Sequence, residues 1–200
     1  MSVHILPHLE SANASFVTPR LLVGGDLSSD RDRAADQLHE LVAAGVTHII
    51  DVRIEATDER FVAEAASSLS YRHHGVDDRG QRIPGRWFQE GTTYILRALA
   101  DPQAIVLAHC HMGINRGPSI GFAALLALGW DCVDALDAIR TARPIAYVDY
   151  AEDALAWHHA RTSAPKWSRA ADLTRVAAWR SHNRLDVHAV IRGIRSADIR

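Results

Sequence analysis

The fold of this chain is decided by the stretch His109-Cys110-His111-Met112-Gly113-Ile114-Asn115-Arg116-Gly117-Pro118-Ser119. It follows an apolar run at residues 105–108, and its proline is typical of the first turn of a helix. A strand, a tight turn and a helix N-terminus in this order direct backbone N–H groups and the positive end of the helix dipole into one cradle. Such a cradle can bind a tetrahedral oxyanion.

The side chains at the two ends of this turn indicate covalent phosphate chemistry. The field that holds an oxyanion also favours thiolate over thiol, so we expect Cys110 to act as a nucleophile. Arg116, six positions later, offers a planar fork for two phosphate oxygens. Gly113 supplies the backbone freedom that the turn needs. The predicted phosphate-binding residues are His111, Met112, Gly113, Ile114, Asn115 and Gly117.

Cleavage of a phosphate ester through a cysteine also needs an acid that protonates the leaving oxygen. The loop after the preceding predicted strand contains Asp77 and Asp78, and Asp78 lies 32 residues before Cys110. We predict Asp78 as the acid and keep Asp77 as the alternative. A cysteine in apolar surroundings is usually an inert packing residue. We expect this for Cys132, which has no arginine, glycine and upstream Asp at the spacing seen around Cys110.

Composition limits the class of protein. Two hundred residues with 48% hydrophobic content can bury one sizeable core, and no run approaches the roughly 20 apolar residues of a membrane span. Residues 1–8 lack the pattern of a secretory signal. The predicted helix after the loop would carry Cys132 about 18 Å or more from Cys110, too far for a disulfide. We therefore expect a reduced, cytoplasmic protein. No cofactor is predicted and no metal, because the paired histidines lack zinc-site spacing.

Strand and helix patterns alternate along the chain. Strands are predicted at residues 20–23, 46–52, 69–74 and 104–109. Helices are predicted at 30–44, 58–67, 87–100, 117–129, 134–140 and 149–161. This alternation predicts an α/β fold with a central, mostly parallel sheet flanked by helices. Ligands of such sheets bind at the carboxyl ends of the strands, where Cys110 falls.

Charge and patterning divide the chain at residue 165. Residues 1–165 carry 14 Lys and Arg against 21 Asp and Glu, whereas residues 166–200 carry 8 against 3. We predict a catalytic domain at 1–165 and a basic helical extension at 166–200. The extension shows two short amphipathic helices, one with Leu173, Val176 and Ala177 on a face, the other with Val187, Val190, Ile191 and Ile194. They either dock on the domain or on a second copy, as a homodimer, or form an arginine-rich arm for an anionic partner or membrane surface.

The loop resembles that of the dual-specificity branch of the cysteine-dependent protein tyrosine phosphatases, with its pattern His-Cys-x-x-Gly-x-x-Arg-Ser/Thr and an upstream acidic Asp. Segments 20–25, 49–53 and 140–146 are similar to other family segments in the right order, and the resemblance covers roughly residues 16 to 160. It implies a protein tyrosine phosphatase-like fold of the dual-specificity type. It also implies a phosphocysteine on Cys110, phosphate binding by Arg116, acid catalysis by Asp78 and support of the loop by His109.

One position departs from the family pattern. The family has Ser or Thr directly after the arginine, where its hydroxyl stabilises the cysteine as leaving group. Here that position is Gly117, and the first hydroxyl belongs to Ser119, two residues later. We therefore expect slow breakdown of the phosphoenzyme unless Ser119 or a water replaces the missing hydroxyl.

The leading interpretation is hydrolysis of phosphotyrosine in proteins, with or without phosphoserine and phosphothreonine. An RNA 5′-triphosphatase is an alternative because those loops carry Gly-x-Asn-Arg, although the acidic main domain makes nucleic acid a less favoured partner. Inositide phosphatases rank lower because this loop lacks lysine. A slow or inactive phosphatase that binds phosphoprotein stays open because of Gly117. Sulfur transfer and arsenate reduction are disfavoured by the order of acid before cysteine.

Overall fold

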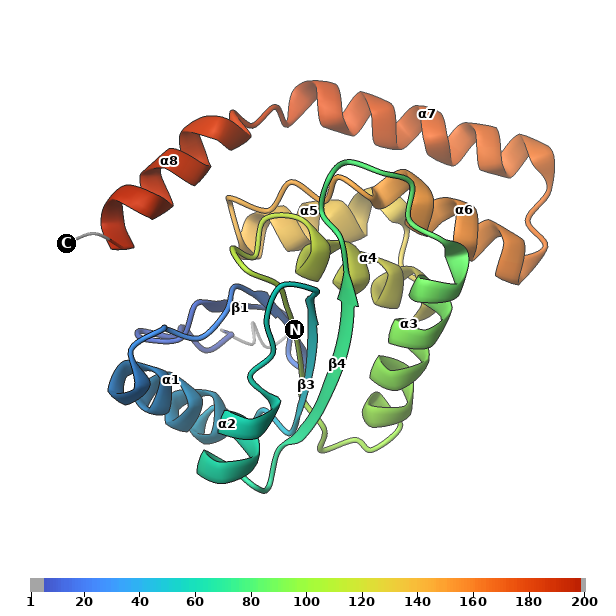
Figure 1. Ribbon diagram of the computed structural model, residues 1–200. Coiled ribbons are helices and arrows are strands. Elements are labelled where there is room, and N and C mark those ends of the chain that lie inside the picture. The colour runs from blue at the N-terminus through green and yellow to red at the C-terminus, as the bar shows by residue number, and fades with distance from the viewer. Residues whose placement is uncertain (1–5, 199–200) are drawn as a thin grey trace.

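The computed structural model describes residues 6–198 and contains one five-stranded sheet in the order β1-β2-β5-β3-β4 (Figure 1). Its strands are β1 (Ala14–Thr18), β2 (Leu21–Gly24), β3 (His48–Arg53), β4 (Ser70–Val76) and β5 (Val106–His109). Only β1 pairs antiparallel, with β2, and the other three pairings are parallel. The predicted mostly parallel sheet is confirmed. No strand was predicted at residues 14–18, where β1 lies. Residues 1–8 were predicted not to form a secretory signal, and residues 1–5 of that segment lie outside the described residues.

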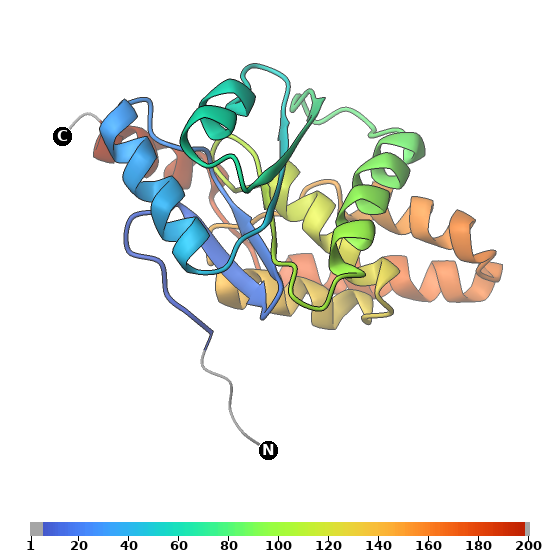
Figure 2. The same cartoon turned by 90° about the horizontal axis from the view of Figure 1, so that it is seen from below.

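Helices cover both faces of this sheet (Figure 2). Helices α1 (Arg31–Ala43) and α2 (Glu59–Ala65) lie on one face. The other face carries α3 (Gly85–Leu99), α4 (Arg116–Ala127), α5 (Cys132–Ala142) and α6 (Ala151–Thr162). Side chains alternate along the strands, so each face has its own apolar cluster. Leu22, Ile49 and Leu107 pack toward α1 and α2, whereas Val23, Ile50 and Ala108 pack toward the larger set of helices.

Helix α4 is the central helix of the larger layer. Its residues from Arg116 to Leu126 are all buried, which is the pattern of a helix enclosed by protein on every side. Trp87 and Phe88 at the start of α3 are buried in the same cluster. Because α4 starts where β5 ends, this packing fixes the position of the loop between them.

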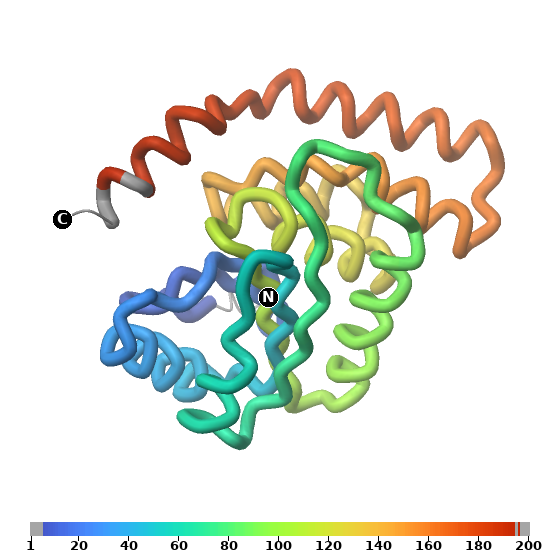
Figure 3. The backbone as a smooth tube through the Cα atoms, viewed as in Figure 1, coloured from blue at the N-terminus to red at the C-terminus, as the bar shows by residue number. Residues whose placement is uncertain are grey.

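The C-terminal segment forms two further helices, α7 (Lys166–His182) and α8 (Val187–Asp198) (Figure 3). Helix α7 docks on the preceding part of the chain, because Val176 and Trp179 belong to the larger apolar cluster. The indole N–H of Trp179 donates to Asp137 at 2.6 Å. Of the predicted packing face, Val176 is buried, whereas Leu173 and Ala177 are exposed. The helix has 17 residues and is longer than the short helix that was predicted.

Among residues 6–198, none of the helices combines the length and the apolar character that a membrane crossing requires.

Candidate active site

The predicted strand, turn and helix around Cys110 are present. Strand β5 ends at His109, and α4 begins at Arg116 with Asn115 as its N-cap residue. The backbone N–H of Cys110 donates to the carbonyl of Gly24 at 3.2 Å, which ties the cysteine to the neighbouring strand. Cys110 is 2% exposed and both cysteines are free. The sulfur therefore lies at the end of a parallel strand and beside a helix N-terminus, where a bound anion is stabilised.

Arg143, which follows α5, holds the loop from behind. Its Nε donates to the carbonyl of Gly113 at 2.7 Å, and its Nη2 donates to the carbonyl of Met112 at 2.9 Å. Because the peptide unit is planar and trans, carbonyls that face Arg143 turn the N–H groups of the same peptides to the opposite, concave side. Burial lowers the pKa of Arg143, and the nearby Cys110 acts in the opposite direction. This arginine orients the donors of the oxyanion cradle.

Gly113 allows this close approach. Its φ is +66°, and an added Cβ would collide with the guanidinium of Arg143 and with the backbone of Gly24. No residue with a side chain fits there without moving the loop. The predicted need for glycine at this turn is confirmed.

Arg116 is 5% exposed, and Glu55 binds the end of its guanidinium. The Nη1 and Nη2 groups donate to the two carboxylate oxygens of Glu55 at 2.7 and 2.6 Å. Nη1 also donates to the carbonyl of Val76 at 3.1 Å. These hydrogen bonds from Arg116 lower the pKa of Glu55 to about 2. Although burial opposes the charge of Arg116, the hydrogen bonds to Glu55 raise its pKa, so both partners stay charged.

The opposite edge of the guanidinium, formed by Nε and the second Nη2 hydrogen, remains for a ligand. Within residues 6–198, Nε has no hydrogen-bond partner. Asp78 Oδ2 lies 3.2 Å from it, close enough for an ion pair, but the N–H is not directed at that oxygen. A guanidinium fixed by Glu55 on one edge thus offers its other edge to two oxygens of a phosphate.

Asp78 is held in the site by two donors. Its Oδ1 accepts hydrogen bonds from Asn115 Nδ2 at 2.7 Å and from the Tyr150 hydroxyl at 2.8 Å. Burial and the hydrogen bond to Asp78 raise the pKa of Tyr150, so its hydroxyl remains a donor. Asp77 instead pairs with Arg79 at 2.7 Å and accepts from the backbone N–H of Asp78. Of the two carboxylates, only Asp78 lies at the cysteine loop.

The residues after Arg116 support the loop without contacting the sulfur. Ser119 is fully buried, and its hydroxyl donates to Asn115 Oδ1 at 3.2 Å. Within the described residues, its hydroxyl makes no hydrogen bond to Cys110, so the predicted substitution for the missing hydroxyl is not formed in this structure. A Cβ on Gly117 would lie 3.0 Å from the carbonyl of Ala108 and 3.1 Å from the N–H of Cys110. This position is close to the cysteine and tightly packed.

Helix α7 of the C-terminal segment also supports the candidate site. Val148, which lies before α6, has a φ of 55°, a conformation that β-branched residues rarely adopt. Arg180 of α7 donates to the carbonyls of Val148 and Asp149 at 2.9 and 2.7 Å. The N–H of Asp149 donates to Asn115 Oδ1 at 2.7 Å, and Asn115 in turn holds Asp78. Helix α7 is therefore linked by hydrogen bonds to the candidate acid.

His109 lies behind the loop in a buried ionic cluster. Burial lowers its pKa, so the imidazole is neutral near pH 7, and its Nε2 is 3.9 Å from Asp51. Asp51, Asp58 and His109 are close enough together to hold a metal ion. However, Arg53 Nη2 contacts Asp51 at 2.7 Å and Asp58 at 2.5 Å, so a cation already occupies the space between them. Asp51 and Arg53 are thus structural partners at the end of β3.

The loop opens into a cleft of about 580 Å³. Of the predicted site residues, Cys110, Arg116, Asp78, His111, Met112, Ile114 and Asn115 line it. Gly113 and Gly117 form the backbone beneath, and His109 and Ser119 lie behind the loop. Tyr147 and Asp149 also line the cleft, as do residues of the C-terminal segment, from Leu185 to Ile191.

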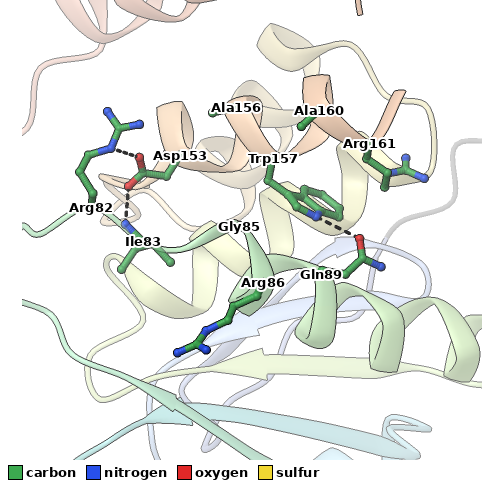
Figure 4. Close-up of a pocket in the computed structure, with 10 residues that line it drawn as sticks. All are labelled: Arg82, Ile83, Gly85, Arg86, Gln89, Asp153, Ala156, Trp157, Ala160 and Arg161. Carbon is green, nitrogen blue, oxygen red and sulfur yellow. Dashed lines mark hydrogen bonds and ion pairs between the residues drawn. The ribbon is translucent and has the colours of Figure 1, made fainter. Parts of the chain in front are cut away.

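A second hollow, of about 540 Å³, lies between the start of α3 and helix α6 (Figure 4). Its buried Asp153 accepts from the N–H of Ile83 at 2.8 Å and pairs with Arg82 at 2.6 Å. Trp157 lies one turn further along α6, and its indole donates to Gln89. The contacts of Asp153 fix the segment that follows the Asp78 loop to helix α6. This hollow is separate from the cleft at Cys110.

Comparisons with known proteins show which proteins this chain is similar to. Human dual specificity protein phosphatase 13B is 27% identical over 132 residues, which cover 64% of either chain. Human dual specificity protein phosphatase 26 is 30% identical over 116 residues, covering 57% of this chain and 51% of that protein. The chain thus spans less than two thirds of the length of these curated relatives. No protein-family model matches it.

Solved structures share the fold. A crystal structure of PTPMT1 in complex with PI(5)P has a TM-score of 0.62 and 17% identity, covering 76% of this chain and 97% of that one. Human DUSP28 has a TM-score of 0.61 and 19% identity, covering 75% and 95%. The chain has the protein tyrosine phosphatase-like α/β fold of these structures, as predicted. With dual-specificity phosphatases as its relatives in sequence, the resemblance drawn from the Cys110 loop is confirmed.

Sequence reasoning missed Glu55, Tyr150 and a role for Arg143. Glu55 follows the carboxyl end of β3, the edge at which ligands of parallel sheets bind, and this signal could have found it. Arg143 and Tyr150 lie 33 and 40 positions after Cys110, and their pairing with the loop depends on tertiary packing alone.

Proposed function

We propose that this protein is a cysteine-dependent phosphatase that hydrolyses phosphotyrosine in proteins, with or without phosphoserine and phosphothreonine. One observation carries the proposal: Cys110, the open edge of Arg116 and the carboxylate of Asp78 line one cleft at a helix N-terminus. Nucleophile, phosphate-binding group and acid are the three requirements of this reaction. The names of the sequence relatives support a phosphorylated protein as substrate.

In the first step, the thiolate of Cys110 attacks phosphorus, and the bond from phosphorus to the leaving oxygen breaks. Arg116 and the loop N–H groups bind the non-bridging oxygens, whose charge is greatest in the transition state. Protonated Asp78 gives its proton to the leaving oxygen. Glu55 keeps Arg116 in place, and Asn115 and Tyr150 keep Asp78 facing the cleft.

In the second step, Asp78 accepts a proton from water while the water oxygen attacks the phosphocysteine. The phosphorus–sulfur bond breaks, and inorganic phosphate and the thiolate are released. The sulfur leaves without a neighbouring hydroxyl from position 117, because that residue is glycine. We therefore propose that this second step limits turnover and that rapid mixing shows a burst of product.

A pH–rate profile with p-nitrophenyl phosphate on wild type and Cys110→Ser tests the nucleophile. We expect Cys110→Ser to lose turnover and to keep affinity for phosphate and vanadate. Asp78→Asn should lose rate mainly on esters with poor leaving groups, because a good leaving group needs no proton. Equal loss on all esters would identify a different acid, and full activity of Cys110→Ser would exclude the mechanism.

A phosphorylated protein is the proposed partner, and a reducing compartment such as the cytoplasm is the proposed location. The homodimer through the C-terminal helices stays a prediction.

A further inference from the structure

Helix α8 forms one wall of the catalytic cleft. Val187, His188 and Ile191 of α8, with Leu185 before it, line the same cavity as Cys110 and Arg116. Residues three and four positions apart lie on one side of a helix, so the side of α8 that carries Ile191 faces the cleft of Cys110. Figure 1 shows α8 at the end of the molecule toward which the parallel strands point.

The segment that carries α8 is anchored at its start. Arg140 donates to the carbonyl of Asn183 at 3.1 Å, and the N–H of Asn183 donates to Trp179 at 2.9 Å. Asp186 then caps the helix by accepting from the N–H of Ala189 at 2.8 Å. The position of the wall therefore follows from the docked helix α7.

The apolar side of α8 is only partly covered. Val187, Val190, Ile191 and Ile194 are all half-buried. A helix that packed fully on its own domain would bury this side, as Val176 and Trp179 of α7 are buried. Because Val187 and Ile191 line the cleft itself, the apolar surface left uncovered there is continuous with the phosphate site.

We propose that α8 is the substrate-selecting wall of this cleft, where Leu185, Val187 and Ile191 bind an apolar side chain next to the phosphotyrosine of a peptide. The inference rests on the proposed function and assigns the substrate a sequence preference. An extended peptide advances about 3.3 to 3.6 Å per residue, so the side chain lies one or two positions from the phosphotyrosine.

The charge of the cleft favours this occupant over an anionic membrane. Asp78 and Asp149 line the cleft opposite the apolar wall, and Glu55 lies beside it on Arg116. Among the described residues that line the cleft, the single Lys or Arg is Arg116, and it is needed for the phosphate itself, so an acidic flank or a polyanionic lipid surface would find no further arginine or lysine in the lining. A neutral apolar flank needs no such partner and covers the exposed side of α8.

The experiment uses the full chain and three phosphotyrosyl peptides that differ in the flanking residue: Leu, Gly or Glu. We expect wild type to prefer the Leu peptide over the Gly peptide by about tenfold in kcat/KM, as burial of one such side chain allows. Ile191→Ala should reduce this preference to about twofold or less, measured as the ratio of the two peptides with the same variant. Val190→Ala is the matched control, because Val190 is equally half-buried on α8 but does not line the cleft.

Three outcomes would overturn the proposal: equal turnover of the Leu and Gly peptides by wild type, an unaltered preference in Ile191→Ala, or an equal loss in Val190→Ala. Sedimentation with anionic vesicles adds a further arm. Vesicle binding that both variants weaken, without a peptide preference, would assign α8 to a membrane instead.

Calorimetric binding of the same peptides to Cys110→Ser separates this proposal from the proposed function, because it needs no turnover. If the Leu peptide binds more tightly but wild type turns over none of the peptides, the role proposed for α8 stands and the proposed phosphatase activity is excluded. If wild type turns over all three peptides equally, the phosphatase activity stands and the role proposed for α8 is excluded.

Discussion

Replacement of Arg143 by methionine tests whether a buried cation orients the loop that holds the phosphate. The change removes the donors to the carbonyls of Met112 and Gly113 and the Nη2 contact with Asn13 Oδ1 at 2.7 Å. A buried acceptor left without a partner costs about 1 to 3 kcal/mol, so two loop carbonyls together cost about 2 to 6 kcal/mol. Methionine recovers part of this by filling the space. We expect the free energy of unfolding to fall by about 3 to 5 kcal/mol.

Urea unfolding measures this loss from the shift in midpoint, provided that the slope is unchanged. Vanadate affinity measures the orientation of the loop, and we expect it to fall about tenfold or more as the carbonyls turn away from the lost cation. Arg143→Lys is the control, since an ammonium keeps the charge but cannot match the spacing of Nε and Nη2. We expect an intermediate loss of both quantities. A methionine variant within about 1 kcal/mol of wild type, with unchanged vanadate affinity, would refute the reasoning.

Two further substitutions test the missing hydroxyl at position 117 and the carboxylate of Glu55 that binds Arg116. Gly117→Ser should speed phosphoenzyme breakdown about tenfold, the effect of one hydrogen bond to a charged sulfur, and abolish the burst in rapid-quench kinetics. Its tightly packed Cβ should cost about 1 kcal/mol of stability, and a persisting burst would exclude this role. Glu55→Gln should lower kcat/KM with smaller effects on overall stability, because Arg116 loses its bidentate carboxylate; unchanged kinetics would show that Arg116 needs no fixing. The pKa of Glu55 is lowered to about 2, so its stabilising effect is complete above its ordinary pKa and is lost as the pH falls from about 4.5 to about 2. Acid unfolding of wild type and Glu55→Gln should therefore converge in that range, with a modest difference above it because the carboxylate is 45% exposed.

The fold could be read largely from short-range patterns. Strand β3 carries the β-branched apolar pair Ile49-Ile50, and Asp30, the predicted first residue of a helix, caps α1 by accepting from the N–H of Arg33. Strand β1 escaped prediction because a five-residue edge strand needs its partner β2 before its pattern has meaning. The register of such an edge is a tertiary property.

The candidate site divides in the same way. Cys110 and Arg116 are joined by one short turn between β5 and α4, so their closeness in space could be predicted from their spacing in the sequence. Asp78 could be proposed from its distance along the chain, but its choice over Asp77 depends on Asn115 and Tyr150, which only folding brings to it. The amphipathic pattern of residues 187–194 predicted a helix correctly and could not show which surface that helix covers.

The hydrogen-bonded path from Arg180 through Asp149 to Asn115 has a consequence for synthesis of the chain. A ribosome delivers Asp78, Cys110 and Arg116, the candidate reacting groups, at least 64 residues before it delivers Arg180. Until that residue emerges, the nascent protein has Asn115 and Tyr150 to hold Asp78 but lacks the arginine that braces the segment around Asp149. We expect activity to appear late in translation, after the rest of the domain has collapsed.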